Sequence, residues 1–219
     1  MVDLIRGLAP ERIRANLDHV RQQISATGRD PAEVEILAAV KYLPAESLGA
    51  LADGGVVLVG ENRAQELVVK LAAVPGRFTW DFIGTLQSRK VADLLPCVRY
   101  IQSVASDSAL AQLARHGHPE TQVMVQVNVA GEVGKGGIAP DELAAFLDRC
   151  PVTVVGLMTM PPYADRAEHS RPHFAALRRL AQEHGLRHLS MGTSQDYVVA
   201  VQEGATIVRL GSILYAGAP

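Results

Sequence analysis

Long apolar runs, a disulfide pattern and a strong charge of one sign are all missing from this 219-residue sequence. Its apolar runs are far shorter than the roughly 20 residues with which a helix crosses a bilayer, and its first residues do not begin a signal peptide. The net charge of −2 provides no basic field that would attract nucleic acid or anionic lipid. We therefore expect a cytoplasmic protein with no nucleic-acid or membrane partner.

Motifs of metal and dinucleotide sites are also missing. Cys97 and Cys150 are the only two cysteines, and neither belongs to a C-x-x-C motif, so we expect two reduced thiols and no metal site. No G-x-G-x-x-G sequence follows a predicted strand, which counts against a dinucleotide-binding fold. No linker, repeat or low-complexity segment divides the chain, so residues 1–219 are expected to form one domain.

What the sequence does contain is a regular alternation of short apolar segments and amphipathic ones. Strands are predicted at residues 35–41, 56–59, 80–84, 99–104, 122–129, 152–157, 186–190 and 206–210. Helices are predicted at residues 10–26, 45–52, 88–95, 167–184 and 194–203, with others ending at Val74 and near Gly117 and one beginning at Pro140. This order predicts an α/β protein that is a single (β/α)₈ TIM barrel with an extra N-terminal helix. An open doubly wound sheet is the alternative.

Lys41 ends the first predicted strand, after five consecutive apolar residues. Parallel α/β barrels place their chemistry at the carboxyl ends of the strands. Desolvation of an ammonium group there lowers its pKa and makes the neutral amine available as a nucleophile. Lys41 is therefore the candidate Schiff-base lysine, and a solvated or ion-paired lysine is the alternative.

The loops after the seventh and eighth strands are rich in small residues, at the two places where barrels commonly bind phosphate. Ser194 stands where the N-cap of the next helix is predicted, and the amides of that first turn would face an anion. Gly211 allows close approach of a ligand to the backbone, and Ser212 adds a hydroxyl and an amide. A plain helix cap is the alternative role for Ser194.

Arg209 lies in an otherwise apolar strand and, by alternation, shares one face with Ile207 and Gly211. A guanidinium inside a barrel is costly unless it is paired or directed at a ligand. The alternative is a buried ion pair with a carboxylate such as Glu61 or Asp81.

A lysine nucleophile, a phosphate site and an inward arginine suit pyridoxal 5′-phosphate. Since arginine does not give up its proton, it cannot stabilise a protonated pyridine ring, and this disfavours carbanion chemistry. The residues alone leave a Schiff-base aldolase for a phosphorylated sugar as a competitor.

The chain resembles the pyridoxal phosphate homeostasis proteins, which are related to the N-terminal barrel of alanine racemase. The resemblance rests on an ordered set of segments that begins with Lys41 and continues with residues 60–63, 82–84, 86–88, 126–128, 156–159, 189–192 and 208–211. It implies that Lys41 holds pyridoxal 5′-phosphate as a Schiff base. It also implies that Ser194, Gly211 and Ser212 bind the phosphate and that Arg209 faces the ring nitrogen. Asn62 and Met191 are expected in the pocket wall. Lys135 resembles a family lysine near the site, but a solvated loop lysine is the favoured alternative.

The resemblance further implies a monomeric carrier or buffer of the cofactor without strong catalytic activity, with apo-enzymes as possible partners. Racemisation needs acid/base groups on both faces of the substrate Cα. In the racemases a tyrosine from the partner's second domain serves one face, and we expect this chain to lack such a domain. A pyridoxal-phosphate-dependent amino-acid racemase or another Schiff-base lysine enzyme is the alternative.

Overall fold

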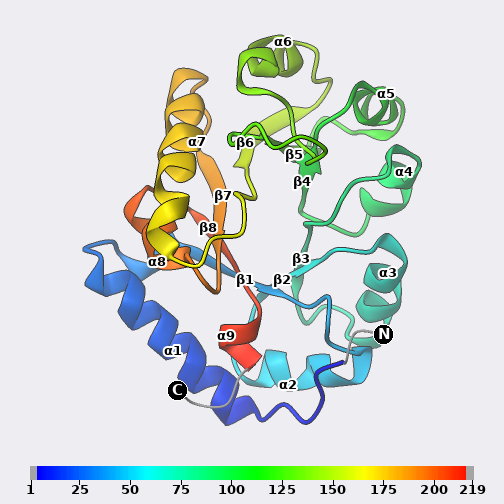
Figure 1. Cartoon of the computed structure of the whole chain (residues 1–219). Helices are drawn as coiled ribbons and strands as arrows, with labels where there is room; N and C mark the ends of the chain where they lie inside the picture. Colours follow the sequence, from blue (N-terminus) through cyan, green and yellow to red (C-terminus); the bar gives the residue numbers. More distant parts are fainter. Residues whose placement is uncertain (1–3, 216–219) are drawn as a thin grey trace.

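The computed structural model describes residues 4–215, which form a closed barrel of eight parallel strands surrounded by helices (Figure 1). The strands are β1 (Glu35–Ala39), β2 (Leu58–Glu61), β3 (Thr79–Phe82), β4 (Tyr100–Val104), β5 (Gln122–Gln126), β6 (Thr153–Met158), β7 (His188–Thr193) and β8 (Ile207–Leu210). Each strand pairs with its neighbours in the sequence, and β1 closes the barrel by pairing with β8. The predicted (β/α)₈ architecture is confirmed, and the open sheet is excluded.

Helices follow the strands and cover the outside of the barrel (Figure 1). They are α1 (Pro10–Ala26), α2 (Leu48–Asp53), α3 (Ala64–Ala73), α4 (Val91–Leu94), α5 (Asp107–His116), α6 (Leu143–Asp148), α7 (Arg171–Glu183), α8 (Tyr197–Gln202) and α9 (Ser212–Tyr215). Short 3₁₀ turns precede β1 and several helices, at Pro31–Glu33, Ala45–Ser47, Ser88–Lys90, Pro140–Glu142 and Ala167–Ser170. The extra N-terminal helix α1 has the predicted bounds, and it lies alongside α9 (Figure 1).

Two apolar cores follow from the alternation of side chains along the strands. A large core fills the layer between barrel and helices, and a small one inside the barrel contains Leu37, Leu58, Tyr100, Met124 and Ile207. Further along the inside of the barrel, toward the carboxyl ends of the strands, the buried side chains are polar and include Gln102, Ser190 and Arg209. This polar layer lies directly below the open end where the chemistry is expected.

Several predicted boundaries are wrong by two or more residues. Strand β2 begins at Leu58 rather than at residue 56, and it continues through the polar Glu61. Val57, just before the strand, is 72% exposed. Strand β7 continues to Thr193, so α8 begins only at Tyr197. Strand β5 ends at Gln126, three residues before its predicted end.

Other predictions concern thiols, metals and membranes. Both cysteines are free, and both are half-buried. Two histidine pairs, His169 with His173 and His184 with His188, have i, i+4 spacing, yet the described residues contain no group of three or more metal ligands. Between residues 4 and 215 no helix is both long enough and apolar enough to cross a membrane.

Candidate functional site

A cavity of about 450 Å³ opens at the carboxyl ends of the strands. Its described lining residues come from the N-terminal segment, from the ends of most strands and from the loops that follow them: Ile5, Ala39, Lys41, Tyr42, Asn62, Ile83, Gly84, Thr85, Gln126, Met158, Met160, Thr193, Ser194, Gln195, Arg209, Gly211, Ser212 and Tyr215. Six of the seven predicted site residues are in this set. The structure thus brings together side chains that lie up to 171 positions apart, from Lys41 to Ser212.

Lys41 lines the cavity two residues after the end of β1. Its side chain is exposed, and its Nζ lies 4.7 Å from the ring centroid of Tyr42. The expectation that the protein itself desolvates this ammonium is therefore wrong, because the cavity is open above it. A ligand bound in the cavity would shield the Lys41 side chain from solvent.

Ser194 is not the N-cap of α8, because that position belongs to Asp196. The Ser194 Oγ instead accepts hydrogen bonds from the backbone N–H groups of Gly211 at 3.1 Å and Ile213 at 3.4 Å. Because both bonds use its lone pairs, its single proton is left to donate, as an anion requires. Two loops that the sequence analysis assigned to phosphate are thereby joined at one hydroxyl.

Arg209 points into the barrel as its alternation predicts, and it is only 6% exposed. Its Nη1 donates to Ser190 Oγ at 2.6 Å, and its Nη2 donates to the Thr159 carbonyl oxygen at 2.8 Å. Neither proposed carboxylate partner is used, since Glu61 pairs with Lys70 and Asp81 pairs with Arg99.

The charge of this guanidinium is therefore not neutralised by an ion pair within the described residues. Burial lowers the pKa of Arg209 to about 10, against an opposing effect of the Asp196 carboxylate. The side chain is still charged at neutral pH. A ligand with hydrogen-bond acceptors would offset the free-energy cost of burying this charge.

Asn62 presents a buried amide oxygen at the end of β2. Its Oδ1 accepts no hydrogen bond from any described residue, although buried acceptors are normally paired. The backbone beside it is fixed, because Glu61 Oε1 accepts from the N–H groups of Asn62 at 2.6 Å and Arg63 at 3.1 Å. The other Glu61 oxygen binds the buried ammonium of Lys70, which also donates to the Val40 carbonyl at 2.8 Å. Lys70 in α3 therefore joins the two strand ends that carry Lys41 and Asn62.

Two predicted positions lie outside the cavity wall. Met191 is fully buried in the outer core, because it alternates with the inward-facing Ser190 on β7, so its side chain does not line the cavity. Lys135 is half-buried and donates to Glu132 Oε2 at 2.5 Å and to the Pro161 carbonyl at 3.0 Å, beside the cavity rather than in it. Neither side chain is therefore part of the described cavity wall that contains Lys41.

Sequence reasoning missed several cavity residues that a simple rule could have found. Tyr42, Thr85 and Met160 each follow the end of a strand by two or three residues, as Lys41 does, and each lines the cavity. Tyr215 in α9 also lines it and donates its hydroxyl to the Ala39 carbonyl at 3.1 Å. No comparable signal marks Ile5, whose N–H donates to the Tyr42 carbonyl at 2.9 Å.

The electrostatic character of the cavity is one-sided. Among its described lining residues are two cations, Lys41 and Arg209, and no aspartate or glutamate. Such a wall favours an anionic ligand, and the small-residue loops at one side are suited to a phosphate group.

Comparisons with known proteins agree with this geometry. Residues 9–219 match the family model described as alanine racemase, N-terminal domain. The chain is 36% identical to the pyridoxal phosphate homeostasis protein of Aquifex aeolicus over 94% of this chain and 97% of that one. It is 37% identical to the protein of the same name from Pseudomonas aeruginosa, over 95% and 97% of the two chains. The structure of PipY from Synechococcus elongatus with PLP bound superimposes with a TM-score of 0.78 at 29% identity, covering 93% of this chain and all of that one.

Proposed function

The chain belongs to the pyridoxal phosphate homeostasis protein family, and we propose that it binds pyridoxal 5′-phosphate in the barrel cavity and acts in intracellular cofactor homeostasis. The observation that carries this proposal is the described cavity wall, which has two cationic side chains, no carboxylate, and small residues from the loops after β7 and β8. The cofactor is a phosphorylated, anionic aldehyde, so each of these features has a counterpart in it.

Polar groups with unused hydrogen-bonding capacity or unpaired charge support binding of pyridoxal 5′-phosphate in this cavity. The Asn62 Oδ1 is buried and accepts nothing from the described residues, so a hydroxyl group of a ligand would complete it. The Ser194 hydroxyl has a proton to donate, and Arg209 carries a charge that no ion pair of the described residues neutralises. Asn62 directly follows β2, Ser194 lies in the loop after β7, Arg209 lies in β8, and all three line one cavity.

The roles proposed for the residues follow from their positions. When bound, pyridoxal phosphate supplies an aldehyde carbon that condenses with an amine, and a conjugated ring that absorbs visible light. Lys41 provides that amine, while Ser194, Gly211 and Ser212 hold the phosphate. Arg209 faces the ring nitrogen, and Asn62 contacts the ring from the wall.

This arrangement favours holding the cofactor over using it. A carboxylate beside the ring nitrogen would stabilise the protonated ring, whereas the Arg209 guanidinium only donates hydrogen bonds. The ring therefore remains a weak electron sink.

The racemase alternative requires a second acid/base group across the cavity from Lys41. Tyr215 lines the cavity, but its hydroxyl donates to the Ala39 carbonyl, and burial raises its pKa well above the ordinary value. It is therefore a poor base. Incorporation of solvent deuterium at the Cα of an amino acid, at useful turnover, would favour the enzyme instead.

The decisive experiment is spectroscopic. The purified protein incubated with pyridoxal 5′-phosphate should turn yellow, and borohydride followed by peptide mapping should locate the reduced adduct on Lys41. The Lys41→Ala variant should lose the visible band. Lys135→Ala is the matched control, since Lys135 lies beside the cavity and should leave the band intact. A wild-type protein that stays colourless would contradict the proposal.

The finer parts of the proposal concern context. We propose that the protein acts in the cytoplasm, as a monomer, and that apo-enzymes requiring pyridoxal phosphate receive the cofactor from it. Sedimentation of the loaded protein tests the monomer. Appearance of activity in an apo-enzyme mixed with the loaded protein, at a rate above that of cofactor dissociation into buffer, tests direct transfer.

A further inference from the structure

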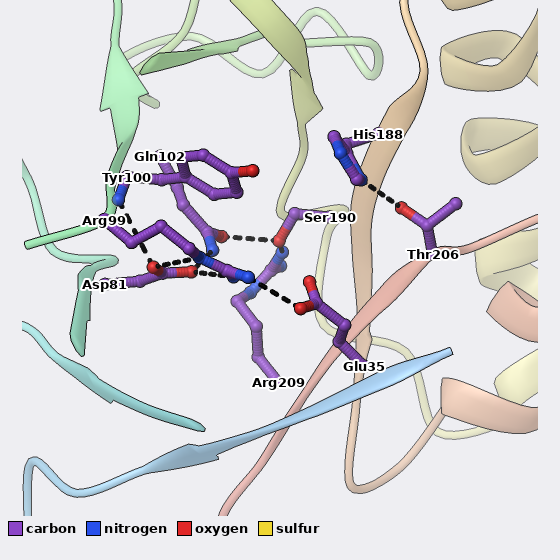
Figure 2. Close-up of polar contacts among 9 residues, drawn as sticks. All are labelled: Glu35, Asp81, Arg99, Tyr100, Gln102, His188, Ser190, Thr206 and Arg209. Atoms are coloured by element: carbon purple, nitrogen blue, oxygen red, sulfur yellow. Dashed lines mark hydrogen bonds and ion pairs between the residues drawn. The ribbon is translucent and has the colours of Figure 1, made fainter. Parts of the chain in front are cut away.

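A chain of hydrogen bonds crosses the inside of the barrel and ends at Arg209 (Figure 2). Arg209 Nη1 donates to Ser190 Oγ at 2.6 Å, and Ser190 Oγ donates to Gln102 Oε1 at 2.6 Å. Gln102 Nε2 then donates to Asp81 Oδ2 at 2.7 Å. Arg209 and Ser190 lie in the neighbouring strands β8 and β7, and Gln102 and Asp81 lie in β4 and β3. The hydrogen-bond chain therefore connects two separate parts of the barrel wall.

At its far end the chain is anchored by an ion pair. Arg99 Nε and Nη2 donate to the two carboxylate oxygens of Asp81, at 3.0 and 2.8 Å. The remaining nitrogen, Nη1, donates to Glu35 Oε1 at 2.6 Å. Asp81, Gln102 and Ser190 are all fully buried. Each link in the chain is a direct hydrogen bond between protein groups.

The direction of every bond in the chain is determined by its two ends. Arginine can only donate, so Ser190 Oγ must accept from Arg209. The oxygens of Asp81 accept from Arg99, so the amide of Gln102 must turn its NH₂ toward Asp81 and its oxygen toward Ser190. The single proton of Ser190 is thereby directed to Gln102, and its lone pairs remain for Arg209.

We propose that Ser190 and Gln102 are positioning residues for Arg209, which they hold against the bound cofactor without neutralising its charge. The inference rests on the proposed function. A carboxylate in place of Ser190 would fix the guanidinium equally well, but it would compete with the ligand for the positive charge. The neutral hydroxyl avoids this competition, and the negative charge of Asp81 lies two side chains away, already paired with Arg99.

The remaining contacts of Arg209 show why the hydroxyl matters. Its Nη2 donates to the Thr159 carbonyl and to Met160 Sδ, both at 2.8 Å, so the Nη1 side is held by Ser190 alone among the described residues. Loss of that acceptor leaves one side of the guanidinium free to turn. A hydrogen bond to a charged group in a buried site typically corresponds to a tenfold or larger change in an equilibrium constant.

The test compares Ser190→Ala with the matched control Ser103→Ala. Ser103 in β4 is also buried, and its Oγ has no hydrogen-bond partner among the described residues, so Ser103→Ala removes the same group outside the chain. We expect Ser190→Ala to weaken binding of pyridoxal 5′-phosphate about tenfold and to shift the pH midpoint of its visible band. Inorganic phosphate should compete equally well in both variants, because the phosphate loops are unchanged.

A second variant tests whether the residues act as one unit. Gln102→Leu should reproduce the effect of Ser190→Ala, and the double variant should be no worse than either single one, since both break the same chain. Losses that add up, or Ser190→Ala values equal to those of Ser103→Ala, would overturn the inference. Failure of the wild-type protein to bind the cofactor would instead overturn the proposed function.

Discussion

At the scale of single residues, the two buried cations among residues 4–215 are held in opposite ways. Lys70 is 2% exposed and is paired with the carboxylate of Glu61, whereas Arg209 is held by a hydroxyl, a carbonyl and a thioether. The first arrangement satisfies the charge within the protein and suits a structural role. The arrangement around Arg209 leaves its positive charge without a carboxylate partner among the described residues, as expected of a residue that binds a ligand.

Lys70→Met should therefore destabilise the protein strongly. Removal of the ammonium leaves the Glu61 carboxylate buried without its partner, and breaking such a pair typically costs about 3 to 5 kcal/mol. Urea unfolding monitored by circular dichroism would measure this loss. Adding Glu61→Gln to the variant should recover more than half of the stability, because the amide oxygen can still accept from Asn62.

Lys90→Met is the matched surface control, since Lys90 pairs with the exposed Asp93 and should change stability by about 0.5 kcal/mol or less. Equal effects of the two lysine substitutions would contradict the role assigned to Lys70.

His188 provides a pH-dependent contribution to stability. Burial lowers its pKa, aided by Arg187 and Arg99 and opposed by Glu35 and Asp81. The unfolded chain therefore takes up a proton near pH 6.5 while the folded chain does not, so stability falls as the pH drops below about 6.5 and is unaffected above it. His188→Gln should reduce the difference in free energy of unfolding between pH 7.5 and 5.5. An unchanged difference would exclude this contribution.

The residues of the site were predictable to different degrees. Lys41 and Arg209 could be placed because strand ends and side-chain alternation are geometric properties of any barrel. The buried ion pair of Lys70 and Glu61 could not be predicted, because a lysine in an amphipathic helix ordinarily faces water. No local sequence feature marks Lys70 as buried. The side chain of Met191 was misplaced because side-chain alternation was counted along β8, which carries Arg209, but not along the neighbouring β7, which carries Met191.

At the scale of elements, the strand ends at the cavity are packed with little tolerance. A Cβ atom on Gly84 would lie 2.0 Å from the backbone oxygen of Asn62, so the chain after β3 can approach the end of β2 only through this glycine. One on Gly211 would lie 3.8 Å from the Ala39 oxygen, an ordinary contact.

The two glycines therefore predict opposite outcomes for the same substitution. Gly84→Ala should lower the free energy of unfolding by about 1 to 3 kcal/mol, because backbone must move. Gly211→Ala should leave stability nearly unchanged and weaken only the binding of pyridoxal 5′-phosphate, if the ligand approaches that backbone as proposed. Unfolding curves and absorbance titrations of both variants separate the effects, and a stable Gly84→Ala protein would be inconsistent with the packing.

Element types were more predictable than their boundaries. The apolar periodicity identified all eight strands, yet β2 was placed two residues early because Val56 and Val57 are apolar and Glu61 is charged. In the structure Glu61 belongs to the strand, since its charge is compensated by Lys70 from α3, a contact between residues nine apart in sequence. Tertiary pairing of this kind overrides local pattern.

At the scale of the whole molecule, binding of the cofactor should raise the stability of the barrel. Ligand at a hundredfold excess over its dissociation constant adds about 2.7 kcal/mol to the folded state, which for a chain of this size raises the melting temperature by about 5 to 10 °C. Thermal unfolding with and without pyridoxal 5′-phosphate would measure the shift. Pyridoxal without the phosphate, or the Lys41→Ala variant with the full cofactor, should give a smaller one, and an equal shift in all three would argue against the assigned roles.

The pairing of β1 with β8 has a consequence for how the protein matures. Lys41, whose amine receives the cofactor, is synthesised before Ser194, Gly211 and Ser212, and the two groups meet only when β8 pairs with β1. Yellow colour would then report on completion of the barrel, so refolding could be followed in the visible range, with the signal appearing only after the final strand has docked.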